Sequence, residues 1–428
     1  MITPQFRRLS LVLGLISAIG LLCACASSEK LLGSSASPEP TVNIPPRIIG
    51  YFTSWGVAAR GYPVASIPAD KLTHINYAFS AISPLGKCAL GDPTADTQRF
   101  YSIRDSVDKQ ADIKDGPHGT FNQLLKLKQK YPHIKVLISL GGWTGSSLFS
   151  DVAQTEESRQ KFVQSCIELY LQKHAGVFDG VDVDWEYPVS GGARDGKPED
   201  KHNYTLLLEE FRKQLDAQGQ ADGVQYLLTI AAPAGPQIIA NFELDQIDQY
   251  LDWINLMTYD FHGGWDTTTN FLSALYKSSD DPSSPAVRDA FNVDAVVQAY
   301  RKAGIPAHKL VVGIPFYARG WQGVPEENNG LYQSASGPAQ SNLEPGVFTY
   351  SQLVKGYLPT YSRFMHPEAG VPWLYNPETG VMITYEDPES VGLKAEYVKE
   401  NSLGGVMLWE LSQDGGELLN ALYNILYP

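Results

Sequence analysis

Eight short apolar runs, separated by segments of helical periodicity, constrain the fold of this chain most strongly. They cover residues 47–52, 75–79, 136–140, 180–184, 226–230, 254–257, 310–314 and 405–409. Continuous apolar runs are typical of parallel strands buried on both faces. Between two of them, Tyr204, Leu207, Leu208, Phe211 and Leu215 form one helical stripe. Eight strands alternating with helices predict an α/β fold, a (β/α)₈ TIM barrel, with a last helix over 417–426.

The connection between the seventh and eighth runs is longer than a loop and a helix require. It is rich in proline, glycine and aromatic residues. We interpret residues 321–387 as a small inserted α+β domain, and residues 390–400 as the helix that resumes the barrel. The barrel is then expected to comprise residues 46–320 and 388–428.

The N-terminus has the pattern of a secretory signal. Arg7 and Arg8 precede an apolar stretch over residues 9–22, and small residues follow it. The apolar stretch is shorter than the roughly 20 residues that span a bilayer. Residues 1–25 are therefore predicted to be a signal peptide.

The end of this signal, Leu22-Cys23-Ala24-Cys25, resembles a bacterial lipoprotein box in which Cys25 becomes lipidated. Simple cleavage near Ala26 is the alternative. Residues 26–45 are rich in serine and proline and are typical of a flexible tether. We expect a secreted protein or a cell-envelope lipoprotein that meets the membrane only through this lipid.

Charge and cysteine content exclude several classes of partner. The net charge of −14 argues against nucleic acid, which requires a basic surface. After the signal only Cys88 and Cys166 remain, and they can pair in an oxidising compartment, although the sequence does not fix their geometry. No cysteine or histidine cluster indicates zinc. We expect a monomer without metal or cofactor.

Carboxylates gather at the end of the fourth apolar run. Strand alternation places Asp182, Asp184 and Glu186 on one face, toward the barrel mouth where active sites lie. Asp179 is an odd number of residues from these three acids and points to the other face, so we assign it a supporting role. Crowding raises the pKa of at least one carboxyl group, which then stays protonated as a general acid requires. Glu186 is nearest the strand end and is the predicted acid.

Spacing alone leaves two other interpretations of these acids open. Three carboxylates on one face can bind Mg²⁺ or Ca²⁺. They can also form structural ion pairs. No calcium loop and no phosphate-binding loop accompanies them in the sequence.

The pattern Asp179-x-x-Asp182-x-Asp184-x-Glu186 resembles the signature of the family 18 glycoside hydrolases, the chitinases. Three further segments match the family in order: Ser139-Leu140-Gly141-Gly142-Trp143, Met257-Thr258-Tyr259-Asp260 and Trp409. The resemblance covers residues 46–428. It implies a barrel with the substrate site at the carboxyl ends of the strands.

The resemblance also implies a mechanism, in which the substrate's own acetamido group is the nucleophile. Glu186 protonates the glycosidic oxygen and later activates water. Asp184 orients the acetamido group, and Asp182 shares a proton or hydrogen bond with Asp184. Tyr259 donates a hydrogen bond to the acetamido group. The reaction proceeds through an oxazolinium ion with retention and uses no metal or organic cofactor.

By the same resemblance a further set of side chains binds substrate in a cleft with one wall raised by the insertion. The set is Tyr51, Trp143, Tyr187, Met257, Asp260, Trp265, Tyr317, Arg319 and Trp409. Packing is the alternative for any of them, and Met257 is expected to pack beneath the site. Arg319 is expected to pair with Asp260 or with substrate.

The resulting expectation is a chitinase that cleaves β-1,4 links between N-acetylglucosamine units of chitin or chitooligosaccharides. A lectin of the same fold is one alternative, but such lectins typically lose the terminal glutamate or a neighbouring carboxylate, and Glu186, Asp184 and Tyr259 are all present. Hydrolysis of other N-acetylglucosamine glycans, such as N-linked glycan cores or peptidoglycan, is the second alternative.

Overall fold

The computed structural model describes residues 45–428. The predicted signal peptide, the tether and the lipidation site Cys25 lie outside the described residues and stay predictions. Within residues 45–428, no helix combines the length and the apolar character needed to cross a membrane.

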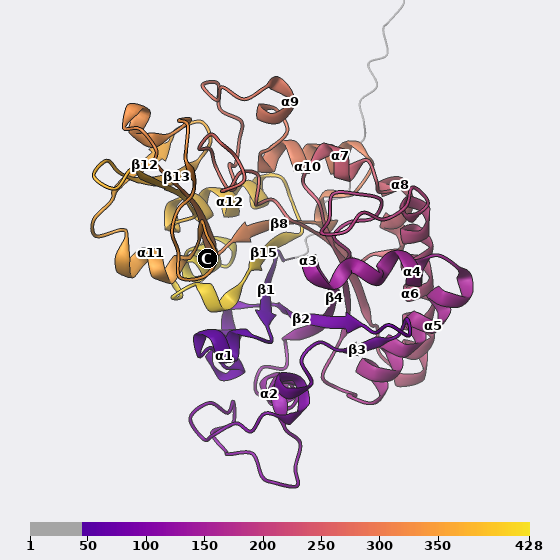
Figure 1. The fold of residues 1–428 in the computed structure, drawn as a ribbon. Coiled ribbons are helices and arrows are strands. Elements are labelled where there is room, and N and C mark those ends of the chain that lie inside the picture. Colours follow the sequence, from indigo (N-terminus) through magenta and orange to yellow (C-terminus); the bar gives the residue numbers. More distant parts are fainter. Residues whose placement is uncertain (1–44) are drawn as a thin grey trace, which may run out of the picture. The chain divides into compact units, whose positions relative to one another are not determined.

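Eight parallel strands close into a barrel, as predicted (Figure 1). They are β1 (Arg47–Thr53), β2 (His74–Ile82), β4 (Lys135–Gly141), β5 (Gly180–Asp184), β6 (Leu227–Ala232), β7 (Trp253–Leu256), β8 (Leu310–Pro315) and β15 (Gly405–Trp409). Neighbours follow the order β1-β15-β8-β7-β6-β5-β4-β2, and pairing of β1 with β2 closes the ring. The short strand β3 (Cys88–Leu90) adds antiparallel to β2. Each predicted run overlaps one of the eight strands, with Tyr226 and Met257 falling one residue outside β6 and β7.

Helices connect the strands and cover the barrel. They are α1 (Gly56–Arg60), α2 (Gly119–Lys130), α3 (Gly142–Gly145), α4 (Phe149–Ala153), α5 (Glu156–Cys166), α6 (Asp200–Asp222), α7 (Pro236–Ile239), α8 (Leu244–Ile247), α9 (Pro285–Arg288), α10 (Val293–Lys302), α12 (Pro388–Glu400) and α13 (Glu417–Leu426). The predicted stripe from Tyr204 to Leu215 is the buried face of α6. The bounds of α13 agree with the predicted last helix.

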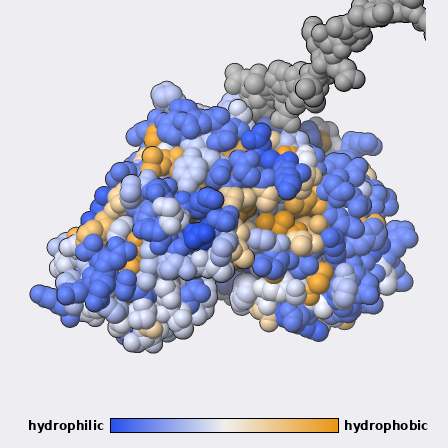
Figure 2. Space-filling model, turned by 90° about the horizontal axis from the view of Figure 1, so that it is seen from above, coloured by the Kyte–Doolittle hydropathy of each residue, from blue (hydrophilic) through white to orange (hydrophobic). Residues whose placement is uncertain are grey.

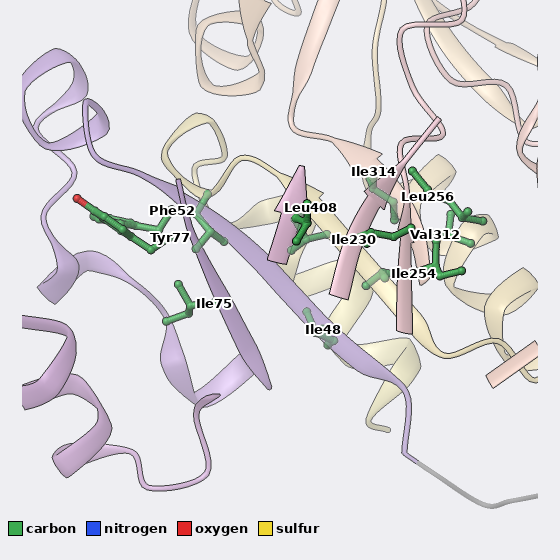
Figure 3. Close-up of a cluster of buried hydrophobic side chains, with 14 of the residues drawn as sticks. Ile48, Phe52, Ile75, Tyr77, Ile230, Ile254, Leu256, Val312, Ile314 and Leu408 are labelled. Carbon is green, nitrogen blue, oxygen red and sulfur yellow. The ribbon is translucent and has the colours of Figure 1, made fainter. Parts of the chain in front are cut away.

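Strand alternation sorts apolar side chains into two cores. One set points outward and packs under the helices, and Figure 3 shows Ile48, Ile75, Ile254 and Leu408 within it. The other set fills the barrel interior: Ile49, Tyr51, Ala78, Leu137, Ala231, Trp253, Met257, Val311 and Met407. Burying apolar surface on both faces of every strand stabilises the ring and fixes which side chains point inward.

A second sheet lies between β8 and α12 in sequence and to one side of the barrel in space (Figure 1). Its elements are β9 (Tyr317–Gln322), β10 (Gly337–Pro338), β11 (Val347–Thr349), α11 (Tyr350–Gly356), β12 (Ser362–His366), β13 (Val371–Asn376) and β14 (Val381–Thr384). All its strand pairs are antiparallel, and it has its own core around Trp321, Trp373 and Met382. We propose that it is the inserted domain.

The inserted sheet is joined to the loop that follows β7. The Ala335 N–H donates to the Thr267 carbonyl at 2.9 Å, and Thr268 forms a β-bridge with Ser334. Gly264 packs so closely on Pro338 that a Cβ there would lie 2.6 Å from it. Seen from above, the surface is mostly hydrophilic and is indented between two lobes (Figure 2).

A disulfide joins Cys88 on β3 to Cys166 at the end of α5. Their Cα atoms are 5.0 Å apart, within the range that a disulfide spans. The structure therefore settles a pairing that the sequence left open. The bond links the edge of the barrel sheet to its helical layer.

A buried ion pair yields a prediction about stability. Lys394 on α12 contacts Glu386, both side chains are at most 1% exposed, and Lys394 also donates to the Ser273 carbonyl at 2.6 Å. Lys394→Met should lower the free energy of unfolding by about 3–5 kcal/mol, because it leaves the Glu386 charge buried and unpaired. Urea unfolding at neutral pH measures this loss. Adding Glu386→Gln should recover much of it, and equal losses in the single and double variants would contradict the explanation.

Candidate active site

Asp182 lies at the centre of the barrel and accepts four hydrogen bonds from four different strands. Its Oδ2 accepts from Tyr51 at 2.6 Å and Ser139 at 2.8 Å, and its Oδ1 accepts from Thr229 at 2.6 Å and Asn255 at 3.2 Å. Burial raises the pKa of this carboxyl. The four donors oppose that rise because they stabilise the anion. These hydrogen bonds favour the ionised form of Asp182, which burial alone disfavours.

Asp184 lies two residues further along β5, closer to the mouth of the barrel. Unlike Asp182, it is not surrounded by hydrogen-bond donors from residues 45–428. It is 3% exposed, and its Oδ1 has no hydrogen-bond partner among the described residues. Burial first, then the charges of Glu186 and Asp182, raise its pKa well above the usual range. This shift favours the protonated form of Asp184. The expected hydrogen bond between Asp182 and Asp184 is not formed in this state, since other donors occupy Asp182.

Glu186 lies two residues beyond the last residue of β5 and reaches the cleft. Burial, and secondarily the negative charge of Asp260, raise the pKa of its carboxyl to about 7. Near neutral pH it can both give and take a proton. This is the property required of a residue that acts first as an acid and then as a base.

Two tyrosines face these carboxylates. Burial and the nearby carboxylates raise the pKa values of Tyr259 and Tyr187 well above normal, so both hydroxyls remain donors. The Tyr259 hydroxyl contacts only the Met407 sulfur, at 3.8 Å, among the described residues. Thioether sulfur is a weak acceptor. A substrate carbonyl can therefore replace this contact with a stronger hydrogen bond.

A cleft of about 930 Å³ opens above these groups. Twelve residues predicted from the sequence line it: Tyr51, Trp143, Asp184, Glu186, Tyr187, Met257, Tyr259, Asp260, Trp265, Tyr317, Arg319 and Trp409. Asp182 is buried beneath it. Trp143 and Trp265 are 51% and 58% exposed, so their faces are available for stacking on a sugar. Met257 belongs to the interior core below the site.

Several lining residues were not predicted. They include Pro233, Ala234, Gly235, Ile238, Phe291, Pro338, Glu344 and Pro345. They come from the loop after β6, from the segment before α10 and from the inserted domain. None belongs to a motif, and their positions depend on how distant loops pack together.

A row of aromatic rings extends the floor of the cleft. Trp409 lies 5.2 Å from Tyr51 and stacks on Phe79 at 5.9 Å, and Phe79 lies 6.1 Å from Trp55. A second hollow beside the cleft is lined by Trp55 and shares Trp409 and Arg319 with it. The groove is therefore longer than the catalytic centre, as an oligomeric substrate requires.

Arg319 joins the inserted domain to the barrel at the edge of the cleft. Its guanidinium forms two hydrogen bonds of 2.9 Å with Asp260 and contacts Glu344 at 3.3 Å. It also lies 4.9 Å from the centre of the Trp265 ring. The structure thus shows the pairing of Arg319 with Asp260 that was one of two expectations. This pairing fixes the position of the Asp260 carboxylate near Glu186.

Asp260→Asn should shift the alkaline limb of the kcat/KM profile to lower pH. It removes the negative charge that raises the pKa of Glu186, and it leaves the positive charge of Arg319 uncompensated nearby. Both changes favour ionised Glu186, so the protonated acid is lost at lower pH. A pH–rate profile measures the shift. Asp216→Asn, on the exposed side of α6, is the matched control, and a limb that stays in place would contradict this coupling.

Among residues 45–428, no group of three or more histidine, cysteine, aspartate or glutamate side chains is arranged to hold a metal ion. The peptide bonds Ala78–Phe79, Glu186–Tyr187 and Trp409–Glu410 are cis. The first lies within β2, and the other two lie beyond the end of β5 and at the end of β15.

Comparison with known proteins identifies the family. Residues 47–414 match the family model of Glycosyl hydrolases family 18. The chain belongs to this family. Membership of family 18 agrees with the closed barrel of eight parallel strands.

Relatives within family 18 support this assignment. The chain is 43% identical over 414 residues to chitinase A1 of Niallia circulans, a match that covers 87% of this chain and 57% of that protein. Its structure superposes on chitinase ChiA74 from Bacillus thuringiensis with a TM-score of 0.81 and 40% identity, covering 90% and 70% of the two chains. The catalytic domain of chitinase B from Arthrobacter TAD20 gives 0.83 at 34% identity, with 89% and 95% covered. The chain spans little more than half the length of chitinase A1.

Proposed function

We propose that this protein hydrolyses β-1,4 links between N-acetylglucosamine units of chitin with retention of configuration. The observation that carries the proposal is the convergence of Glu186, Asp184 and Tyr259 in one cleft floored by Trp409. The relatives named chitinase support the choice of substrate.

In the first step, the protonated Glu186 carboxyl gives its proton to the glycosidic oxygen. The bond from C1 to that oxygen breaks, and the leaving sugar departs with a new hydroxyl. The acetamido oxygen of the remaining sugar attacks C1 and forms an oxazolinium ion. The free Oδ1 of Asp184 accepts the acetamido N–H, and Tyr259 donates to the acetamido oxygen. The Asp182 carboxylate beneath them favours the developing positive charge.

In the second step, the Glu186 carboxylate takes a proton from water. The water oxygen attacks C1 on the face that the leaving group vacated, and the oxazolinium ring opens to restore the acetamido group. Two inversions at C1 give net retention. Glu186 is protonated again and the cycle is complete. A pKa of about 7 suits both halves of this exchange.

We also propose that the protein works outside the cytoplasm. The disulfide between Cys88 and Cys166 requires an oxidising compartment. The predicted signal over residues 1–25 agrees with export, and Cys25 is the proposed lipid attachment site.

The direct test is hydrolysis of a chromogenic chitobioside, with the anomer of the first product followed by NMR. Release of the β-anomer supports the retaining, acetamido-assisted reaction. Release of the α-anomer would overturn it. Absence of hydrolysis together with measurable binding of chitin oligomers would favour the lectin alternative. Faster cleavage of N-linked glycan cores or peptidoglycan than of chitin oligomers would reassign the substrate.

A further inference from the structure

Ser146 makes an unusual set of contacts beside the general acid. It follows α3, comes from the loop after β4, and is 6% exposed. Its Oγ donates toward the Gly142 carbonyl at 2.8 Å and the Asp184 carbonyl at 3.1 Å. The Glu186 N–H donates to the same oxygen at 2.9 Å. One hydroxyl therefore joins the backbones on both sides of Trp185.

Ser146 lies just beyond the point where β4 and β5 stop pairing, and this position explains the importance of its hydrogen bonds. The ladder between β4 and β5 ends at Gly141 and Asp184. Beyond that point the chain after β4 turns into α3, and β5 loses its neighbour on that side. The Glu186 N–H then has no backbone partner among the described residues. Ser146 supplies the missing lateral bond at the residue that carries the acid.

We propose that Ser146 is a positioning residue that holds the Glu186 backbone, and through it the acid's carboxyl group, relative to Asp184. This deepens the proposed hydrolase function and rests on it. The helix α3, which ends directly before Ser146, carries Trp143, and Trp143 forms part of the cleft wall. The hydroxyl therefore also couples a substrate-binding wall to the acid. Ser146 touches no reacting atom.

The test compares kcat and KM on a chitin tetramer, whose leaving group needs protonation, for the unaltered protein and three variants. Ser146→Ala should lower kcat about 10- to 100-fold with KM within about twofold, because small misplacement of a reacting group is costly while binding surfaces remain. Ser146→Cys keeps an atom at the γ position and so leaves no cavity, but its thiol hydrogen-bonds weakly, so it should lose as much. Ser147→Ala is the matched control and should keep its kcat. The midpoint of thermal unfolding shows whether each variant is folded.

A purely structural role predicts a lower unfolding temperature with kcat of the folded protein unchanged. That result in Ser146→Ala and Ser146→Cys would overturn the proposal, and so would an equal loss in Ser147→Ala. If Ser146→Ala does not fold, the Cys variant decides.

A second measurement does not depend on activity. NMR titration of the Glu186 carboxyl should show a lower pKa in Ser146→Cys than in the unaltered protein, because a less fixed carboxyl group is better solvated. An unchanged pKa together with unchanged kcat would refute the role of Ser146. Inactivity of the unaltered protein toward every N-acetylglucosamine glycan would instead refute the proposed function, and the titration would still test Ser146.

Discussion

Glu186→Gln should lower kcat on unactivated chitin oligomers by about 10³- to 10⁴-fold, toward the upper end of what a positioned proton donor contributes. Glutamine keeps the shape of the side chain but can neither protonate the glycosidic oxygen nor take a proton from water. Both halves of the proposed cycle lose their proton carrier. KM should change little, because the aromatic floor and walls of the cleft are intact.

The leaving group provides a sharper form of this test. A nitrophenyl leaving group departs as a stable anion and needs little protonation. Glu186→Gln should therefore retain more activity on a nitrophenyl chitobioside than on a chitin tetramer. Glu243→Gln, the same change outside the cleft, is the control and should behave as the unaltered protein does. A kcat within tenfold of normal on the tetramer would show that another group supplies the proton.

The barrel was predictable because its signal is local. Each strand is a short apolar run, and the helix from Asp200 to Asp222 carries a stripe of period 3.6. The inserted domain was visible only as an overlong connection. Its first strand begins at Tyr317, directly after β8 ends at Pro315, so no break in composition marks its start. We therefore propose residues 317–384 for the domain, compared with the predicted 321–387.

The catalytic carboxylates were predictable for a similar reason. Alternation along one strand is enough to place Asp182, Asp184 and Glu186 on the same side. The surroundings of these carboxylates, by contrast, form only when the barrel closes. The donors to Asp182 come from four other strands, and no local pattern showed that they would occupy both of its oxygens. The resemblance to family 18 implied instead that Asp182 shares a proton or hydrogen bond with Asp184.

The walls of the cleft depend on contacts between distant segments. Glu344 reaches Arg319 because β11, which follows Glu344, pairs with β9, which carries Arg319. Phe291 lines the cleft from the segment that precedes α10. Neither residue lies at a strand end, where sequence reasoning looks for functional groups. Such positions are set by loop packing, which one sequence does not encode in a periodic pattern.

Asp184→Asn should lower kcat by about 10²- to 10³-fold, the usual effect of removing one preorganised group that stabilises transition-state charge. Asparagine fills the same space and still offers an oxygen to the acetamido N–H. It cannot pass a proton to the Asp182 carboxylate beneath it, and so it cannot take on negative charge as the oxazolinium ion forms. The loss should therefore fall on kcat and leave KM within a few fold.

The response to the leaving group distinguishes the roles of the two carboxyl groups. Asp184 assists the attack of the acetamido oxygen on C1, and that attack is needed whatever group departs. A nitrophenyl leaving group should therefore rescue Asp184→Asn much less than Glu186→Gln. The ratio of kcat values on nitrophenyl chitobioside and chitin tetramer, measured for both variants, provides the comparison. Equal rescue would mean that both residues act on the departing oxygen, and the acetamido group would then lack the partner that this mechanism assigns to it.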